Sequence, residues 1–141
     1  MVRFSKYSFI LLFILFFFPS CQNEGDIGDL YGQWRLSQSS VDDLVKQHVQ
    51  IYFSFQGKVV WAKRVDIQEN AYGDVFGSFV HQGDSLILSF SQQNEYTTPE
   101  SLIRNECRFV DPENIRLKVV TLNESGLKVM SGDNYWQFEK Y

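Results

Sequence analysis

The thiol of Cys21 is the side chain with the clearest chemistry in this sequence, because of the residues that precede it. Two basic residues, Arg3 and Lys6, come before a run of twelve residues, 7–18, of which only one is polar. A basic start followed by a short apolar run and small residues is typical of a secretory signal. The run is shorter than the roughly 20 apolar residues that a membrane-spanning helix needs. We therefore predict that residues 1–20 are a signal peptide that is removed by cleavage.

The cleavage point predicts lipidation. Phe18-Pro19-Ser20-Cys21 resembles a lipobox, the four-residue signal that is cleaved before a cysteine carrying a diacylglyceryl group, with Phe18 where Leu is commoner. Cys21 would then begin the mature chain and hold it to a membrane, since several acyl chains bind far more firmly than one. We expect a lipid-anchored protein of the cell envelope, in the outer membrane.

The mature chain has room for one domain. Removing residues 1–20 leaves 121 residues, enough for a single core. The 13 basic residues become 11 against 17 acids, a net charge of −6, which argues against nucleic acid as a partner. Cys107 is the only other cysteine. It lies in an apolar-flanked stretch, so we expect a buried, inert thiol rather than a nucleophile.

The sequence contains no recognisable catalytic or metal-binding pattern. His48 and His81 are the only histidines, and neither has a second His or Cys at the spacing of a metal site. Motifs of hydrolases, metalloproteases and phosphate-binding loops are absent. Asp42 and Asp43 are adjacent, and the start of a helix explains them better than a pair of catalytic carboxylates. We therefore expect no enzyme activity, no metal and no cofactor.

Alternating apolar and polar residues predict mostly β-structure. Residues 21–30 are polar and acidic and are expected to form a flexible tether, and residues 31–141 to form the folded domain. Gly, Asn and Asp turns join the segments into sequential hairpins. The predicted strands are residues 33–39, 49–56, 58–66, 73–82, 85–91, 114–122, 127–131 and 134–140, and short helices are predicted at residues 41–47 and 98–106.

About eight sequential strands favour an all-β fold. A single up-and-down antiparallel barrel is the first choice, since closure removes the exposed edges that an open sheet would leave. A two-sheet sandwich is the alternative.

Several features of these strands resemble a known family. Gly32-Gln33-Trp34 resembles the G-x-W element of lipocalins, and residues 136–141 supply an aromatic last strand with a basic residue. Together with Gly83-Asp84 before an apolar strand and the helix at residues 98–106, they resemble the small lipocalin-like lipoproteins of Bacteroidetes over most of residues 30–141. The resemblance implies a lipocalin-like barrel, not a reaction.

The two ends of the predicted barrel would meet. Trp136, Phe138 and Lys140 share one strand face, so closure would bring the Lys140 ammonium over the Trp34 indole, a contact of about 0.5–2 kcal/mol. Lipocalins more often place an arginine there, and a lysine stem that only packs on the indole is the alternative. We predict that Gly32, Trp34 and Lys140 form the barrel closure, with Trp34 buried at the closed end.

The function depends on the barrel interior, which an eight-stranded barrel can either fill with side chains or keep open for one small ligand. The candidates for lining a cavity are Phe53, Phe55, Phe79, Phe90 and Trp136, with Trp34, Trp61 and Phe76 in the wider aromatic set. An open interior would make the protein a membrane-anchored module that binds a small apolar ligand. A packed interior would make it an accessory or structural subunit that contacts an envelope protein.

Two further resemblances concern processing. Residues 22–26 resemble the acidic tether that exports many lipoproteins of this bacterial group to the cell surface, so we expect surface exposure. Asp84-Ser85-Leu86 resembles their short sequon for O-glycosylation. A turn requires Asp84 in any case, so glycosylation of Ser85 stays open.

Overall fold

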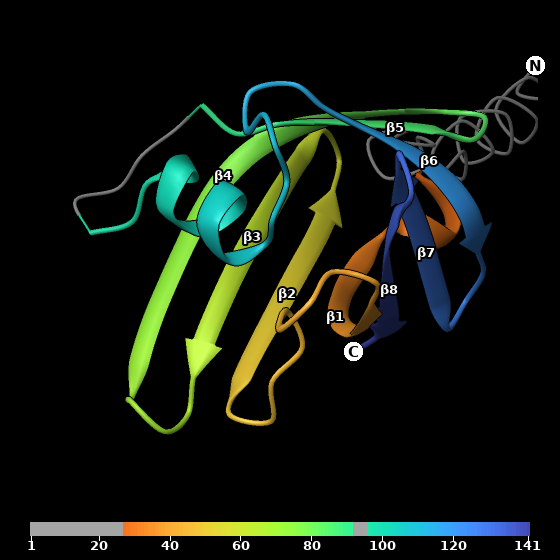
Figure 1. The fold of residues 1–141 in the computed structure, drawn as a ribbon. Coiled ribbons are helices and arrows are strands. Elements are labelled where there is room, and N and C mark those ends of the chain that lie inside the picture. Colours follow the sequence, from red (N-terminus) through yellow and green to blue (C-terminus); the bar gives the residue numbers. More distant parts are fainter. Residues whose placement is uncertain (1–26, 92–95) are drawn as a thin grey trace, which may run out of the picture.

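A computed structural model describes residues 27–91 and 96–141. The predicted signal peptide, Cys21 and residues 22–26 of the predicted tether lie outside the described residues. The described chain forms one closed antiparallel barrel (Figure 1). Its strands are β1 (Gly32–Ser39), β2 (Val49–Gln56), β3 (Val59–Asp66), β4 (Ala71–Gln82), β5 (Ser85–Ser89), β6 (Ile115–Leu122), β7 (Gly126–Ser131) and β8 (Asn134–Lys140). The predicted eight-stranded up-and-down barrel is confirmed, and the sandwich is excluded.

Each strand pairs with the next along the chain, and β8 pairs with β1 to complete the circle. Because neighbouring strands run in opposite directions, their connections alternate between two ends. The β2–β3, β4–β5 and β6–β7 turns lie at one end with the start of β1, and we call it the closed end. The other connections lie at the opposite end, which we call the mouth. The two ends therefore receive different segments of the chain.

Strand alternation builds the core. In β2, Ile51, Phe53 and Phe55 are buried and face the interior, while Ser54 and Gln56 face outward. The same alternation in the other strands joins the inward side chains into one hydrophobic cluster. This burial is the main force that closes the sheet.

The closed end is covered by η2 (Gly28–Leu30), a 3-10 turn that precedes β1. Leu30 is fully buried, and its carbonyl accepts a hydrogen bond from Trp34 Nε1 at 2.9 Å. The sequence placed residues 27–30 in the flexible tether, and the structure corrects that boundary. The Leu30 side chain belongs to the core, and its carbonyl satisfies a buried indole, so the domain begins before Tyr31.

No helix forms at residues 41–47, so that prediction was wrong. Asp43 has a φ of 59°, a left-handed conformation that an α-helix does not continue. The hydroxyl of Ser40, directly before this segment, accepts a hydrogen bond from the backbone N–H of Tyr135 at 2.8 Å. Leu44 is buried in the core. The segment is therefore a loop that is fastened to β8 and covers part of the mouth.

The second predicted helix is present as η3 (Glu100–Glu106), a π-helix in the β5–β6 connection. Two reciprocal hydrogen bonds precede and hold its first turn: the N–H of Ser101 donates to Thr98 Oγ1 at 3.1 Å, and the N–H of Thr98 donates to Ser101 Oγ at 3.1 Å. In Figure 1, η3 lies beside β3 and β4. Within residues 27–91 and 96–141, no helix has the length and apolar character that crossing a membrane requires.

Candidate functional site

The predicted closure residues meet at the closed end. Trp34 is fully buried and pairs with Lys140 across the β1–β8 ladder. Lys140 Nζ lies 4.3 Å from the centre of the Trp34 ring. It also donates hydrogen bonds to the carbonyls of Asp29 and Tyr31, so the ammonium ties η2 to the last strand. Burial lowers the pKa of Lys140 from its ordinary value.

Gly32 is required beside this contact for two reasons. Its φ is 116°, in the left-handed region that favours glycine. A Cβ at this position would also lie 3.0 Å from Lys140 Nζ and 3.1 Å from Lys140 Cε. Glycine therefore lets the chain bend out of η2 while the lysine lies over the indole.

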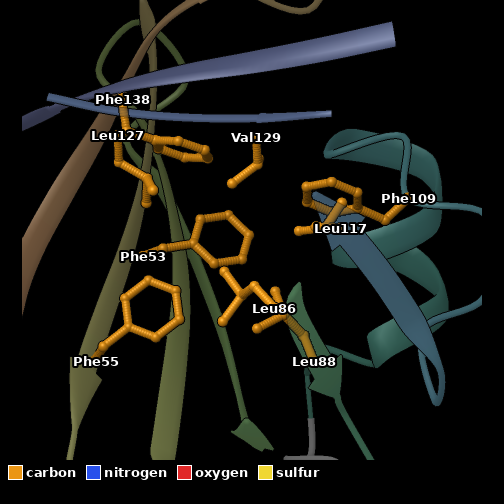
Figure 2. Close-up of a pocket in the computed structure, with 9 residues that line it drawn as sticks. All are labelled: Phe53, Phe55, Leu86, Leu88, Phe109, Leu117, Leu127, Val129 and Phe138. Atoms are coloured by element: carbon orange, nitrogen blue, oxygen red, sulfur yellow. The ribbon is translucent and has the colours of Figure 1, made fainter. Parts of the chain in front are cut away.

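The barrel interior is filled by side chains. The void at its centre has a volume of about 10 Å³, which is about the space that one water molecule needs. Figure 2 shows Phe53 in the middle of the side chains around this void. Phe53 makes edge contacts with Phe90, Phe109 and Phe138 at centroid distances of 6.2, 6.0 and 5.5 Å. The void is lined by Phe53, Phe55, Leu86, Leu88, Phe109, Leu117, Leu127, Val129 and Phe138.

The five aromatic residues predicted to line a cavity are all buried in the core. Phe53 and Phe55 line the central void, whereas Phe79, Phe90 and Trp136 pack around it. Phe79 makes an edge contact with Phe55 at 5.1 Å. The structure therefore brings these residues together as packing partners in a nearly solid interior.

Phe109 is a central residue that the sequence did not single out. It comes from the β5–β6 connection, yet its ring lies 4.5 Å from that of Trp136. The Trp136 indole donates a hydrogen bond from Nε1 to the Cys107 carbonyl at 3.0 Å. Strand periodicity carries no signal for Phe109, because the residue belongs to an irregular segment.

The β5–β6 connection closes the mouth, and we call residues 99–109 the mouth plug. Its inward side chains belong to the barrel core and are almost completely buried: Leu102, Ile103, Cys107 and Phe109. Its backbone is closed on itself by the N–H of Cys107 bonding to the Leu102 carbonyl and the N–H of Phe109 bonding to the Ile103 carbonyl. The mouth is therefore occupied by part of the chain.

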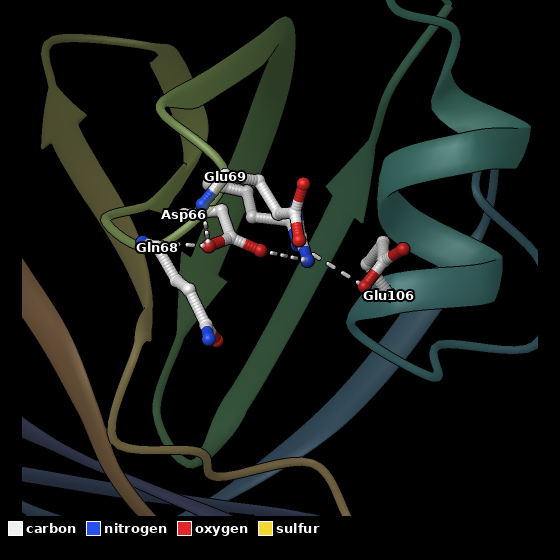
Figure 3. Close-up of polar contacts among 5 residues, drawn as sticks. Asp66, Gln68, Glu69 and Glu106 are labelled. Carbon is white, nitrogen blue, oxygen red and sulfur yellow. Dashed lines mark hydrogen bonds and ion pairs between the residues drawn. The ribbon is translucent and has the colours of Figure 1, made fainter.

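One charged cluster joins the mouth plug to the barrel wall. Arg64 of β3 places Nε 3.1 Å from Glu106 Oε2 and Nη2 3.5 Å from Asp66 Oδ2 (Figure 3). Asp66 is buried, and its Oδ1 accepts the backbone N–H groups of Gln68 and Glu69 at 3.0 Å each. The bond from Glu69 is the main cause that holds the pKa of Asp66 below its ordinary value.

A shallow hollow of about 170 Å³ lies beside this cluster. It is open to solvent and combines charged, hydroxyl and aromatic side chains. Pockets for small-molecule ligands usually measure about 300–1,000 Å³, so the hollow is small for such a ligand. Its lining residues are Arg64, Ala71, Tyr72, Gly73, Thr97, Ser101, Leu102 and Glu106.

Trp61 and Phe76 lie on the outer face of the barrel, so neither lines the interior; for Trp61 the sequence leaves the direction open, because the apolar run 59–62 is continuous. Their rings stack at 5.6 Å with an interplanar angle of 2°. Phe76 is 45% exposed, and Trp61 Nε1 donates to Asp74 Oδ2 at 3.0 Å. Val60 and Ala62 take the two inward positions beside Trp61. Alternation along β3 therefore sends the indole outward.

The other reactive side chains do not assemble into a site. Burial raises the pKa of the Cys107 thiol far above its ordinary value. His81 is half-buried, and within the part of the chain that the structure describes its Nε2 has no hydrogen-bond partner. Among residues 27–91 and 96–141, no group of three or more His, Cys, Asp or Glu side chains could hold a metal ion. Ser85 is exposed at the start of β5.

Comparisons with known proteins agree with this geometry. Residues 13–141 match the family model of the lipocalin-like domain. The fold is similar to that of a lipocalin-like protein from Bacteroides uniformis, with 18% identity, a TM-score of 0.64, and coverage of 81% of this chain and 100% of that chain. It is also similar to an uncharacterized protein from Bacteroides eggerthii, with 18% identity, a TM-score of 0.62, and coverage of 79% and 99%. None of the curated proteins compared with the sequence matches it. Because the family model spans most of its length, this chain belongs to the lipocalin-like domain family.

Proposed function

We propose that this protein is a lipid-anchored lipoprotein of the cell envelope whose lipocalin-like barrel is not an enzyme and acts through its outer surface, as an accessory or structural subunit. The filled interior carries the proposal. A void of about 10 Å³ is far smaller than the roughly 300–1,000 Å³ of a ligand pocket. Within residues 27–91 and 96–141, the side chains around this void therefore leave too little space for a small ligand.

The anchor is Cys21. The features that support it are the basic start, the short apolar run and the small Ser20 directly before the cysteine. Of the two cysteines, the other is Cys107, which is buried in the core and is not accessible for modification.

Fractionation of cells that produce Cys21→Ser tests the anchor. We expect the variant to leave the membrane fraction, or to accumulate as the uncleaved precursor, because lipid attachment needs the thiol. The matched control is Cys107→Ala, which keeps the anchor. Retention of Cys21→Ser in salt-washed membranes at an unchanged precursor size would show that the chain is held in another way.

The mass of the intact protein, recovered from its own membranes in mild detergent, tests the filled barrel. We expect the mass of residues 21–141 plus the acyl groups on Cys21, with no other small molecule at one copy per chain. A stoichiometric apolar molecule that survives the purification would refute the filled-barrel function.

A second function is the binding of a small apolar molecule. It is favoured by the way the mouth plug, a single connection between two strands, covers the barrel interior. The Phe109 of this plug contributes an aromatic ring against both Phe53 and Trp136. Outward movement of this segment would open space between strands of a fold that is wide enough for one small ligand. Titration of the wild type with a fluorescent fatty acid tests this function, and saturable binding at one probe per chain would support it.

A further inference from the structure

The place where the chain enters the barrel limits how the domain can stand on a membrane. Ile27 is the first described residue, and η2 leads from it into β1 at the closed end. Six residue steps separate Cys21 from Ile27. A fully extended chain covers about 3.3–3.6 Å per residue, so these steps span at most about 22 Å.

The barrel is too tall for this tether to let it stand on its mouth. β1 and β2 each have eight residues, or about 26 Å of strand. A typical barrel tilt of about 40° reduces this length to a height of about 20 Å. The mouth plug and the turns at both ends add to that height. A mouth-down barrel would therefore need a tether longer than its maximum, whereas a barrel with its closed end down needs almost none.

The closed end exposes two tyrosines, a valine and a lysine, which suit a lipid headgroup layer, together with the acids Asp29, Asp84 and Glu124. Tyr31 is 50% exposed, Val59 is 48% exposed and Tyr141 is 70% exposed. Lys58, in the β2–β3 turn, is exposed beside them. Tyrosine rings partition into the interface between water and lipid, and lysine stems reach across it. We call Tyr31, Lys58, Val59 and Tyr141 the closed-end rim.

The rim residues belong to neighbouring strands. Gly32 of β1 pairs with Phe55 of β2, so Tyr31 lies next to the β2–β3 turn that carries Lys58. The N–H of Tyr141 bonds to the carbonyl of Gln33 in β1, which places the last residue at the closed end, and its ring packs on Tyr52 of the outer wall at 5.1 Å. Exposed apolar residues also occur at the mouth, for example Ile67 and Val110. Exposure alone therefore does not choose an end, and the tether length does.

We propose that the closed-end rim docks on the headgroup layer of the membrane that holds Cys21, so that the mouth and the Arg64–Glu106 cluster face away from it. The proposal rests on the lipidation of Cys21 proposed above. Because the rim is mainly aromatic and apolar, docking should persist at high salt.

Labelling of the full-length lipidated protein in phospholipid vesicles tests this orientation. The variants Gln56→Cys, next to the rim, and Asp133→Cys, in the β7–β8 turn at the mouth, each carry a fluorophore, while the buried Cys107 stays unlabelled. A nitroxide on the lipid headgroups is expected to quench the label at residue 56 and to leave the label at residue 133 bright. Equal quenching, or stronger quenching at residue 133, would overturn the orientation.

A variant with a longer tether shows whether the rim itself binds the membrane or is only held near it by the anchor. Twenty Gly/Ser residues inserted after Asn23 raise the root-mean-square reach to about 28 Å. Docking by the rim predicts that quenching at residue 56 persists, and that Tyr31→Ser combined with Tyr141→Ser abolishes it. Loss of quenching on insertion alone would show that the rim has no affinity for the membrane. Failure of the protein to bind vesicles through Cys21 would instead refute the proposed anchor.

Discussion

Replacement of Trp34 by alanine is the strongest test of the barrel closure. The side chain has no exposed surface, and its indole nitrogen donates to the Leu30 carbonyl at 2.9 Å. Truncating a buried tryptophan typically costs about 3–5 kcal/mol. That loss is a large share of the roughly 5–15 kcal/mol by which a domain of this kind is stable.

The cation over the ring contributes much less than the burial. Lys140 Nζ lies 4.3 Å from the ring centre, but such contacts are worth about 0.5–1 kcal/mol where the cation is exposed. Lys140→Ala is therefore expected to cost about 1 kcal/mol. The order of the two effects, Trp34→Ala well above Lys140→Ala, follows from buried area and not from charge.

Urea unfolding of purified residues 22–141, followed by circular dichroism, measures both losses. Trp61→Ala is the matched control, because it removes an indole from the outer face that stacks on Phe76. An aromatic pair of this kind contributes about 0.5–1.5 kcal/mol. If Trp34→Ala unfolds at the same urea concentration as Trp61→Ala, the assignment of Trp34 to the barrel closure is wrong.

Three further predictions concern the core and the mouth. Cys107 should resist thiol reagents at pH 8 in the folded protein and react once urea unfolds it, because burial raises its pKa; fast labelling of the folded protein would contradict this. Asp66→Asn should lower the free energy of unfolding near pH 7, because the lowered pKa of Asp66 means that the folded state favours its ionised form. That loss should shrink as the pH falls below about 4 and through the lowered pKa. Urea titrations at several pH values measure the loss, and a loss that stays the same at every pH would contradict the prediction. Phe109→Ala should cost about 3–5 kcal/mol and open a dry cavity that binds small apolar probes such as benzene; Val110→Ala, at an exposed neighbour, is the control that should do neither.

The strands could be predicted from the sequence because their signal is local. Alternation in β2 and turn residues such as Gly57 and Gly83 specify where each strand runs and reverses, and the predicted bounds agree with the structure within two residues. The G-x-W element gave the position of Trp34 for the same reason, since a glycine with a φ of 116° and a buried indole are requirements of a few adjacent residues. The order of hairpins then left few alternatives to a closed barrel.

Irregular segments could not be predicted, because their structure depends on distant partners. The sequence pattern predicts a helix at residues 41–47, but no helix forms there. Asp43 adopts a left-handed conformation, and Ser40 bonds to Tyr135, a residue far away in the sequence. The sequence predicts Leu30 to be part of the tether, but in the structure its carbonyl accepts a hydrogen bond from the Trp34 indole. In both cases, contacts across the fold outweighed local preference.

The sequence by itself determined the strand pattern and the position of the G-x-W element, because these follow from neighbouring residues, and it predicts the anchor at Cys21. Only the tertiary structure decided whether the interior is open or packed, since that volume depends on how side chains from all the strands meet. It is Phe109, from a connection without periodicity, that reaches Phe53 and Trp136 and closes the mouth. A sequence lists the aromatic residues that enter a core, but the space that remains among them is a property of their packing.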